Sequence, residues 1–292
     1  MELDFVKLRD IKPALSGYIR ESQAILKLSP VPDDKAIHDI RVLMKKSRSV
    51  MKLIEGQVDA EGYKRNYYSF REVGRIMRAW RETSVHRKTL KELKKNHPKL
   101  FSMTGDEKLE ALTKKSDLSA GDQTGIMNDL ENINELLNKT GYRLRFQSMD
   151  HFDPKVLIRM LDDTYNNVVE KYLVCRNNPK PANLHLFRKR AKDFLYQLWF
   201  FRPLNPTIVK ALEKKLDAMT QNLGKYNDLA QLIYTLGYKY SVSESSPAMD
   251  ELIIVIREEQ DRYLSKVWPV AYKVFCPGQK LVNVLGFRIL MI

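Results

Sequence analysis

The sequence predicts an all-α protein that is built from two similar halves. Apolar residues recur at helical spacing along most of the 292 residues, and proline, glycine or serine separates successive segments. The pattern His-x-x-Arg-x-x-x-Lys occurs twice, starting at His38 and at His185, which lie 147 positions apart. Because this distance is close to half the chain length, we interpret the motifs as equivalent positions of an internal duplication.

The first half is expected to contain four helices. The first covers about residues 4–28, and the second, which begins with two aspartates suited to the positive end of a helix, covers about residues 33–56. A long third helix is predicted over about residues 60–95 and a fourth over about residues 124–139. Residues 103–123 are rich in glycine, serine and aspartate, so we expect a mobile loop there.

The second half is expected to repeat this plan. Each of its helices starts at or near a proline, where the missing N–H costs no hydrogen bond, and the ranges are about 154–176, 181–201, 206–238 and 247–273. Residues 142–147 show the only strand-like alternation. We therefore divide the chain into a first repeat, a second repeat and a C-terminal tail, with bounds at residues 1–147, 148–276 and 277–292.

Composition and charge indicate a reduced, cytoplasmic protein with an anionic partner. The net charge is +14, and residues 35–99 hold 18 Lys and Arg against 7 Asp and Glu, so the excess is localised. Two cysteines are too few for a disulfide scaffold or a cysteine-based zinc site. The chain starts without a signal-peptide pattern, and its apolar end, residues 281–292, is too short to span a bilayer.

Basic residues are arranged in rows along the predicted helices. In the second helix a basic row runs beside the apolar set Ile37, Ile40, Met44, Met51 and Ile54, and its members are His38, Arg41, Lys45, Arg48 and Lys52, with Lys46 next to it. The third helix adds Arg71, Arg75, Arg78 and Arg81. The second repeat supplies His185, Arg188, Lys189 and Lys192.

These rows favour binding of phosphate groups. Like charges in one row repel, so a helix keeps such a row for a partner or for open water. The planar guanidinium group of arginine can donate two parallel hydrogen bonds to the oxygens of one phosphate, which the ammonium group of lysine cannot do. A solvated face is the ordinary interpretation of a single charged row, but repetition of the motif favours the partner.

The repeated motif resembles the CHAD family, the conserved histidine α-helical domain. Each half of that family carries His-x-x-Arg-x-x-x-Lys or -Arg on its second helix, as at His38 and His185 here. An Arg-Asp or Asn-Asp element follows late in the third helix of each half. Asn227-Asp228 matches its second copy, and Arg81-Glu82 stands where the first is expected.

The resemblance implies two pseudo-symmetric four-helix bundles around a basic central cavity, with inorganic polyphosphate as ligand. The basic rows would line this cavity, while Glu82, Asn227 and Asp228 would orient basic side chains or cap helices. The first repeat is expected to dominate binding, because Asp193 follows Lys192 and nothing in that helix corresponds to Arg48. The expected function is therefore non-catalytic polyphosphate binding, without metal or cofactor, in the cytoplasm or on polyphosphate granules.

Two other functions are weighed against this one. The same rows could bind RNA or DNA, with bases stacked on nearby aromatic residues, namely Tyr63, Tyr67, Tyr68 and Trp80. A metal-dependent phosphohydrolase is suggested by His38-Asp39, but the surrounding cations would repel a metal ion. A Glu-x-Glu-x-Lys motif of the related triphosphate hydrolases does not occur.

Overall fold

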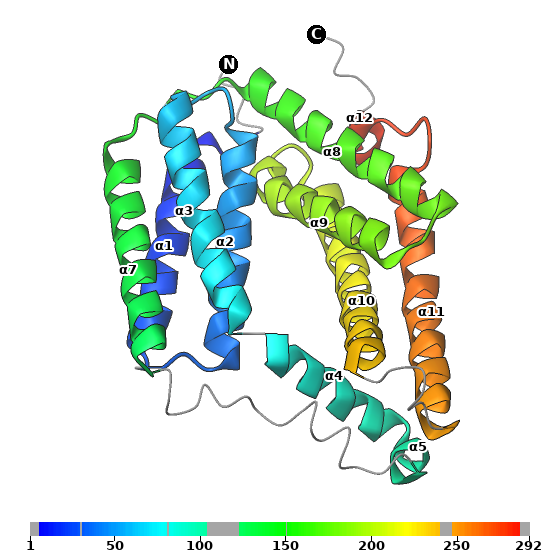
Figure 1. Cartoon of the computed structure of the whole chain (residues 1–292). Helices are drawn as coiled ribbons and strands as arrows, with labels where there is room; N and C mark the ends of the chain where they lie inside the picture. Colours follow the sequence, from blue (N-terminus) through cyan, green and yellow to red (C-terminus); the bar gives the residue numbers. More distant parts are fainter. Residues whose placement is uncertain are drawn as a thin grey trace.

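The protein is described from a computed structural model, which defines residues 6–29, 31–80, 82–103, 123–149, 151–239 and 247–286 (Figure 1). Over these ranges all regular secondary structure is helical and no strand occurs. The all-α prediction is therefore confirmed. None of the helices in the described ranges combines the length and the apolar character needed to cross a membrane.

The helices agree closely with the segments expected from the sequence. In the first half they are η1 (Leu8–Asp10), α1 (Ile11–Lys27), α2 (Asp34–Leu53), α3 (Ala60–Ala79), α4 (Glu82–Asn96), α5 (Pro98–Met103) and α7 (Gln123–Phe146). In the second half they are α8 (Pro154–Asn177), α9 (Pro181–Leu198), η2 (Trp199–Phe201), α10 (Pro206–Lys239), α11 (Pro247–Phe275) and α12 (Leu281–Val284).

Local sequence signals explain where several helices begin. The Asp33 carboxylate accepts a hydrogen bond from the Ala36 N–H at 2.7 Å and caps α2. Asp59 caps α3 and Asp153 caps α8 in the same way. Proline occupies the first position of α8, α9, α10 and α11, as expected.

Two segments differ from the sequence-based expectation. The long third helix is divided into α3 and α4, with Trp80 in a turn after α3. The prediction of a strand at residues 142–147 is wrong, because α7 continues through Phe146. Helical hydrogen bonds satisfy the backbone here without a neighbouring strand. The mobile loop expected between α5 and α7 falls mainly on residues 104–122, which lie outside the described residues.

The helices pack in two groups that meet at α2 and α9. On the left of Figure 1, α1, α2, α3 and α7 pack on one another. On the other side α9 and α10 are neighbours, and α8 and α11 pack against them. The groups are joined where α2 packs against α9 and α8. Helix α4 leaves the first group and packs against α10.

Apolar residues at helical spacing form the core. The apolar set of α2 is buried as expected, with Ile40, Met44 and Met51 fully inaccessible. In the second group Phe275 from α11 packs against Tyr165 from α8 and Phe194 from α9, with ring centroids 5.8 and 6.4 Å apart. The Tyr165 hydroxyl donates a hydrogen bond to the Val274 carbonyl at 2.8 Å, which satisfies its polar group inside this cluster.

Helices α4 and α5 complete a second, smaller core. Leu90 and Leu93 of α4, together with Phe101 of α5, are buried against Leu232 of α10 and Ile256 of α11. This contact fixes residues of the first half against the far ends of two helices from the second half. The burial of these side chains explains why α4 turns away from α3, since a straight continuation would leave them without this cover.

Candidate functional site

Buried polar contacts hold α2 against α9. The Ser49 hydroxyl of α2 donates to the Asp193 carbonyl of α9 at 2.7 Å. The Gln197 amide of α9 donates to the Ser49 carbonyl at 3.0 Å. Ser49 and Gln197 are both fully buried, so these bonds satisfy polar groups that would otherwise be costly inside the interface. They bring the C-terminal parts of the two motif-bearing helices together.

The basic row of α2 lies at the edge of its buried face. Arg41, Lys45, Arg48 and Lys52 are all half-buried, whereas His38, at the start of the row, is exposed. Lys46 is also half-buried, with its ammonium 5.7 Å from the ring centre of Tyr18. Partial burial of these side chains covers part of their aliphatic stems and places the guanidinium or ammonium groups at the border of the core.

The motif arginines of the two halves make corresponding contacts. Arg41 Nη1 donates to the Gly74 carbonyl of α3 at 2.9 Å. Arg188 Nε donates to the Thr220 carbonyl of α10 at 3.1 Å. In each half, therefore, the arginine of the motif helix is anchored on the backbone of the next long helix. A Cβ atom at Gly224 would lie 3.1 Å from Nη2 of Arg188, so the absence of a side chain leaves room for this guanidinium.

His185 lies among basic residues from both halves. Its Nδ1 donates to the Asn227 side-chain oxygen at 3.0 Å. Partial desolvation by neighbouring protein atoms lowers the pKa of His185 below its usual value, whereas the hydrogen bond to Asn227 raises it. The positive charges of Arg188, Lys189 and Lys45 lower that pKa further. Because Lys45 belongs to α2, the field at His185 comes from both motif helices.

Lys189 of α9 also faces the basic row of α2. Partial desolvation lowers the pKa of Lys189, and the charges of Lys52, Arg190 and Arg48 lower it further, while Asp193 opposes them. In the described part of the chain, the Nε–H groups of Arg48 and Arg190 are buried without a hydrogen-bond acceptor. The cations of the two helices thus meet across the α2–α9 contact.

Two carboxylates occupy part of this basic region. Asp193 Oδ2 lies 2.5 Å from Lys52 Nζ, which pairs a residue of α9 with one of α2. It also lies 3.6 Å from Arg190 Nη1. Asp217 Oδ1 of α10 lies 2.9 Å from Lys192 Nζ. Sequence spacing gave no sign of the Asp217 pair, because the two residues lie on different helices and only packing brings them together.

The arginines of α3 are arranged differently from those of α2. Arg71, Arg75 and Arg78 are exposed, and Arg75 pairs with Glu72 of its own helix at 2.6 Å. Arg71 and Arg78 lie three and four positions from Gly74, which puts them on the side of α3 that Arg41 contacts. Arg81 lies outside the described residues. The side chain of Glu82, at the start of α4, is not described either.

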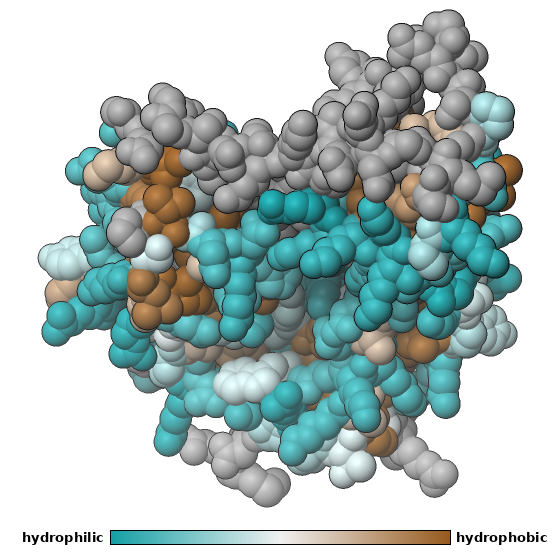
Figure 2. All heavy atoms as spheres, turned by 90° about the horizontal axis from the view of Figure 1, so that it is seen from below, coloured by the Kyte–Doolittle hydropathy of each residue, from teal (hydrophilic) through white to brown (hydrophobic). Residues whose placement is uncertain are grey.

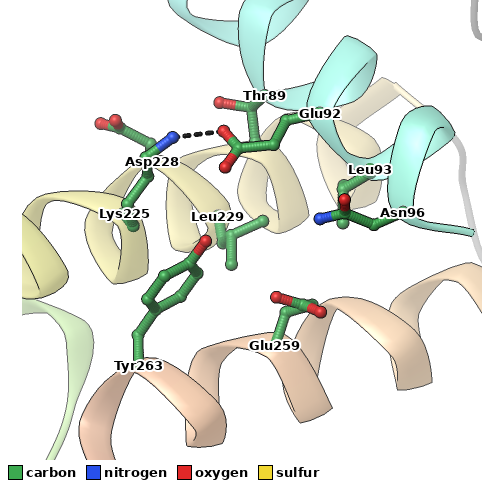
Figure 3. A pocket seen from close by; sticks show the side chains of 9 residues that line it. All are labelled: Thr89, Glu92, Leu93, Asn96, Lys225, Asp228, Leu229, Glu259 and Tyr263. Carbon is green, nitrogen blue, oxygen red and sulfur yellow. Dashed lines mark hydrogen bonds and ion pairs between the residues drawn. The ribbon is translucent and has the colours of Figure 1, made fainter. Parts of the chain in front are cut away.

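Asp228 has a different environment from its neighbour Asn227. It lines a pocket between α4, α10 and α11, together with Thr89, Glu92, Leu93, Asn96, Lys225, Leu229, Glu259 and Tyr263 (Figure 3). Lys225 pairs with Glu92 across this pocket, and Glu259 pairs with His97 at 3.3 Å. These pairs join the first half of the chain to the second, which is a structural role.

Hydrophilic residues cover the middle of the face seen from below the molecule, where the surface is recessed (Figure 2). Within the described ranges, no three His, Cys, Asp or Glu side chains are grouped closely enough to hold a metal ion.

Comparison with known families agrees with the motifs. The profile of the CHAD domain matches residues 17–237, about three quarters of the chain, and this range includes both His-x-x-Arg-x-x-x-Lys motifs. The chain belongs to the CHAD family. No curated protein matches the chain significantly. The CHAD motif residues Arg41 and Arg188 are those that make the corresponding backbone contacts described above.

Sequence reasoning missed several residues that shape this CHAD site. Ser49 and Gln197 are ordinary polar residues in helices, and nothing in their spacing marked them as interface contacts. Tyr196 lies beneath Lys192, whose ammonium is 5.5 Å from the ring centre. Its distance of four positions from Lys192 was the one available signal, since such residues are neighbours on a helix.

Proposed function

We propose that this protein binds inorganic polyphosphate without chemical turnover, in a basic cavity between two pseudo-symmetric helical repeats. The bounds of the repeats would be residues 1–147 and 148–276, with 277–292 as a tail. The principal contacts would come from α2 and α9, and Arg71 and Arg78 of α3 would extend the path. The proposed location is the cytoplasm, including the surface of polyphosphate granules.

One observation carries this proposal. The half-buried cations Arg48 and Lys52 of α2 lie close enough to Lys189 of α9 for their charges to lower its pKa. Like charges that are gathered from two distant segments repel one another, so the arrangement costs free energy in the absence of an anion. A flexible polymer with about one negative charge per phosphate would offset this repulsion at many positions simultaneously. Membership of the CHAD family supports the same ligand.

Nucleic acid is a weaker candidate. Base stacking needs exposed aromatic faces, but Tyr63 and Tyr67 stack on each other and pack against the core, as Trp80 also does. Tyr68 is exposed, with 59% of its surface accessible. Of the four aromatic residues beside the basic rows, this is the one exposed ring, and one ring offers little platform for a run of bases. RNA therefore serves as the competitor in the test of the proposal.

The test is binding of purified protein to labelled polyphosphate over a salt series. We expect affinity to fall by roughly 100- to 1,000-fold between about 50 and 200 mM salt, the slope for about six phosphate contacts on a flexible polymer. Unlabelled single-stranded RNA of equal phosphate concentration should compete poorly. Absence of binding at low salt, or stronger competition by RNA than by polyphosphate itself, would refute the proposed function.

Binding should also depend on pH through His185. In the free protein the pKa of His185 is lowered, which favours the neutral ring. Nδ1 carries the proton that is donated to Asn227, so Nε2 of the neutral ring has no proton to donate. A bound polyanion favours the charged ring and raises this pKa. Binding then takes up a proton between the two pKa values, so affinity rises as pH falls, by at most about tenfold per pH unit.

The measurement is polyphosphate affinity at pH values between about 5 and 8, for the wild type and for His185→Gln. The variant should show a flatter profile, while His151→Gln, which changes an exposed histidine before α8, should leave the profile unchanged. A wild-type affinity that is constant over this range would contradict the role given to His185.

A further inference from the structure

The basic region is partly neutralised by carboxylates of the protein itself. Asp193 pairs with Lys52 at 2.5 Å and Asp217 pairs with Lys192 at 2.9 Å. The lysine side chains are only 22% and 18% exposed. Their ammonium groups are therefore held by these carboxylates in surroundings where water screens the interaction less than at an open surface. The two aspartates differ in exposure, with 13% for Asp193 and 47% for Asp217.

Asp193 and Asp217 both belong to the second half of the chain. Position 193 corresponds to Lys46 when the offset between the two motif helices is applied. On the next helix the anchoring carbonyls are Thr220 and Gly74, so Asp217 corresponds to Arg71. Each acidic position of the second half thus corresponds to a basic position of the first. The change of sign falls on two residues that pair with lysines of the basic rows, Lys52 and Lys192.

We infer that Asp193 and Asp217 are built-in counterions that a polyanion must displace from Lys52 and Lys192, and that they limit the affinity of the site. The inference rests on the proposed function, because it describes how the same site is regulated. A phosphate that approaches Lys52 is repelled by the Asp193 carboxylate, and Lys52 must exchange one negative partner for another. This exchange of partners contributes less binding free energy than the binding of phosphate to a lysine that has no carboxylate partner.

Removing the counterions should therefore strengthen binding. Asp193→Asn keeps the size of the side chain and its ability to accept a hydrogen bond from Lys52, but removes the charge. We expect polyphosphate affinity to increase by about tenfold at low salt for this variant, and by about threefold for Asp217→Asn, which is more exposed and better screened. The salt slope should steepen by about 0.7 for each lysine released, because one more phosphate contact releases counterions.

The experiment measures polyphosphate binding over a salt series for the wild type, both single variants and Asp163→Asn. The last variant removes the same charge from an exposed position of α8 and should leave affinity nearly unchanged. Thermal unfolding is recorded for every protein, because the Lys52–Asp193 pair also joins α2 to α9. If Asp193→Asn does not fold, Asp217→Asn tests the inference through a different helix pair.

The outcomes separate the inference from the proposed function. If the wild type does not bind polyphosphate, the proposed function fails and the inference fails with it. If the wild type binds but the folded variants bind equally or more weakly, the inference alone is overturned, and the aspartates merely position the lysines. Tighter binding with a steeper salt slope, in the order Asp193→Asn, Asp217→Asn, Asp163→Asn, would support it.

Discussion

Replacing the two motif arginines by glutamate should abolish tight polyphosphate binding. In the double variant Arg41→Glu/Arg188→Glu, two positive charges at corresponding positions become negative. We expect affinity to fall by about 100-fold or more at about 100 mM salt, and the salt slope to flatten because fewer phosphates are contacted. The measurement is the affinity for labelled polyphosphate over the salt series used for the wild type.

Controls must separate lost charge from lost structure. Arg41 and Arg188 also donate hydrogen bonds to the carbonyls of α3 and α10, so the circular dichroism spectrum and thermal midpoint of the variant are needed. The pair Arg41→Gln/Arg188→Gln retains a donor at each position without the charge and should lose affinity to an intermediate extent. Arg159→Glu/Arg257→Glu changes two exposed arginines of α8 and α11 by the same charge.

Near-wild-type binding by Arg41→Glu/Arg188→Glu would refute the site, even if the protein binds polyphosphate. Equal weakening by the Arg159→Glu/Arg257→Glu control would mean that net charge alone governs binding. The expected order of affinities is the control first, the glutamine pair next and the glutamate pair last. This order depends on position as well as charge, which a general attraction between a basic protein and a polyanion does not predict.

The largest effect on stability is expected from Phe275→Ala. Phe275 is fully buried, and its ring contacts those of Tyr165, Tyr172, Phe187 and Phe194, with centroids 5.8 to 6.4 Å away. Truncation removes the apolar surface and leaves a cavity, so the free energy of unfolding should fall by about 3–5 kcal/mol. Urea unfolding followed by circular dichroism measures this loss.

Tyr272→Ala provides the matched comparison on the same helix. Tyr272 lies three positions before Phe275 and is 58% exposed, so its truncation should change the free energy of unfolding by about 0.5 kcal/mol or less. Similar losses for both variants would contradict the view that the aromatic cluster stabilises the second group of helices. Phe187 and Phe194 lie in α9, so the same cluster supports the helix that carries Arg188.

Much of the fold could be predicted from local signals. Asp33 and the prolines at the starts of α8 to α11 act through the backbone of their own first turn, so a single sequence contains the information. The apolar set of α2 is similarly local, because helical spacing decides which residues share a face. The division between α3 and α4 was missed, since the helical pattern continues through it and the burial of Leu90 and Leu93 depends on α10 and α11.

The candidate site was predictable to a smaller extent. The basic rows and the repeated motif follow from spacing. Asn227 contacts His185, and the orienting role that the family resemblance implies for it stays a prediction. Asp228, by contrast, lines a pocket beside α4. The pairs formed by Asp193 and Asp217 join residues 141 and 25 positions apart in the chain. Pairs between residues this far apart produce no periodic pattern in the sequence, so they could not be predicted from it.

The sequence by itself determined the helical class, the capped and proline-marked helix starts, the buried face of α2 and the two basic motifs, because each depends on neighbours within a few turns. Tertiary structure alone decided that α2 packs against α9, that the charges of α2 act on Lys189 and His185 of α9, and that Asp193 and Asp217 neutralise part of the charge. Electrostatic energy depends on distance in space rather than along the chain. The strength of the site is therefore set by packing that no single helix specifies.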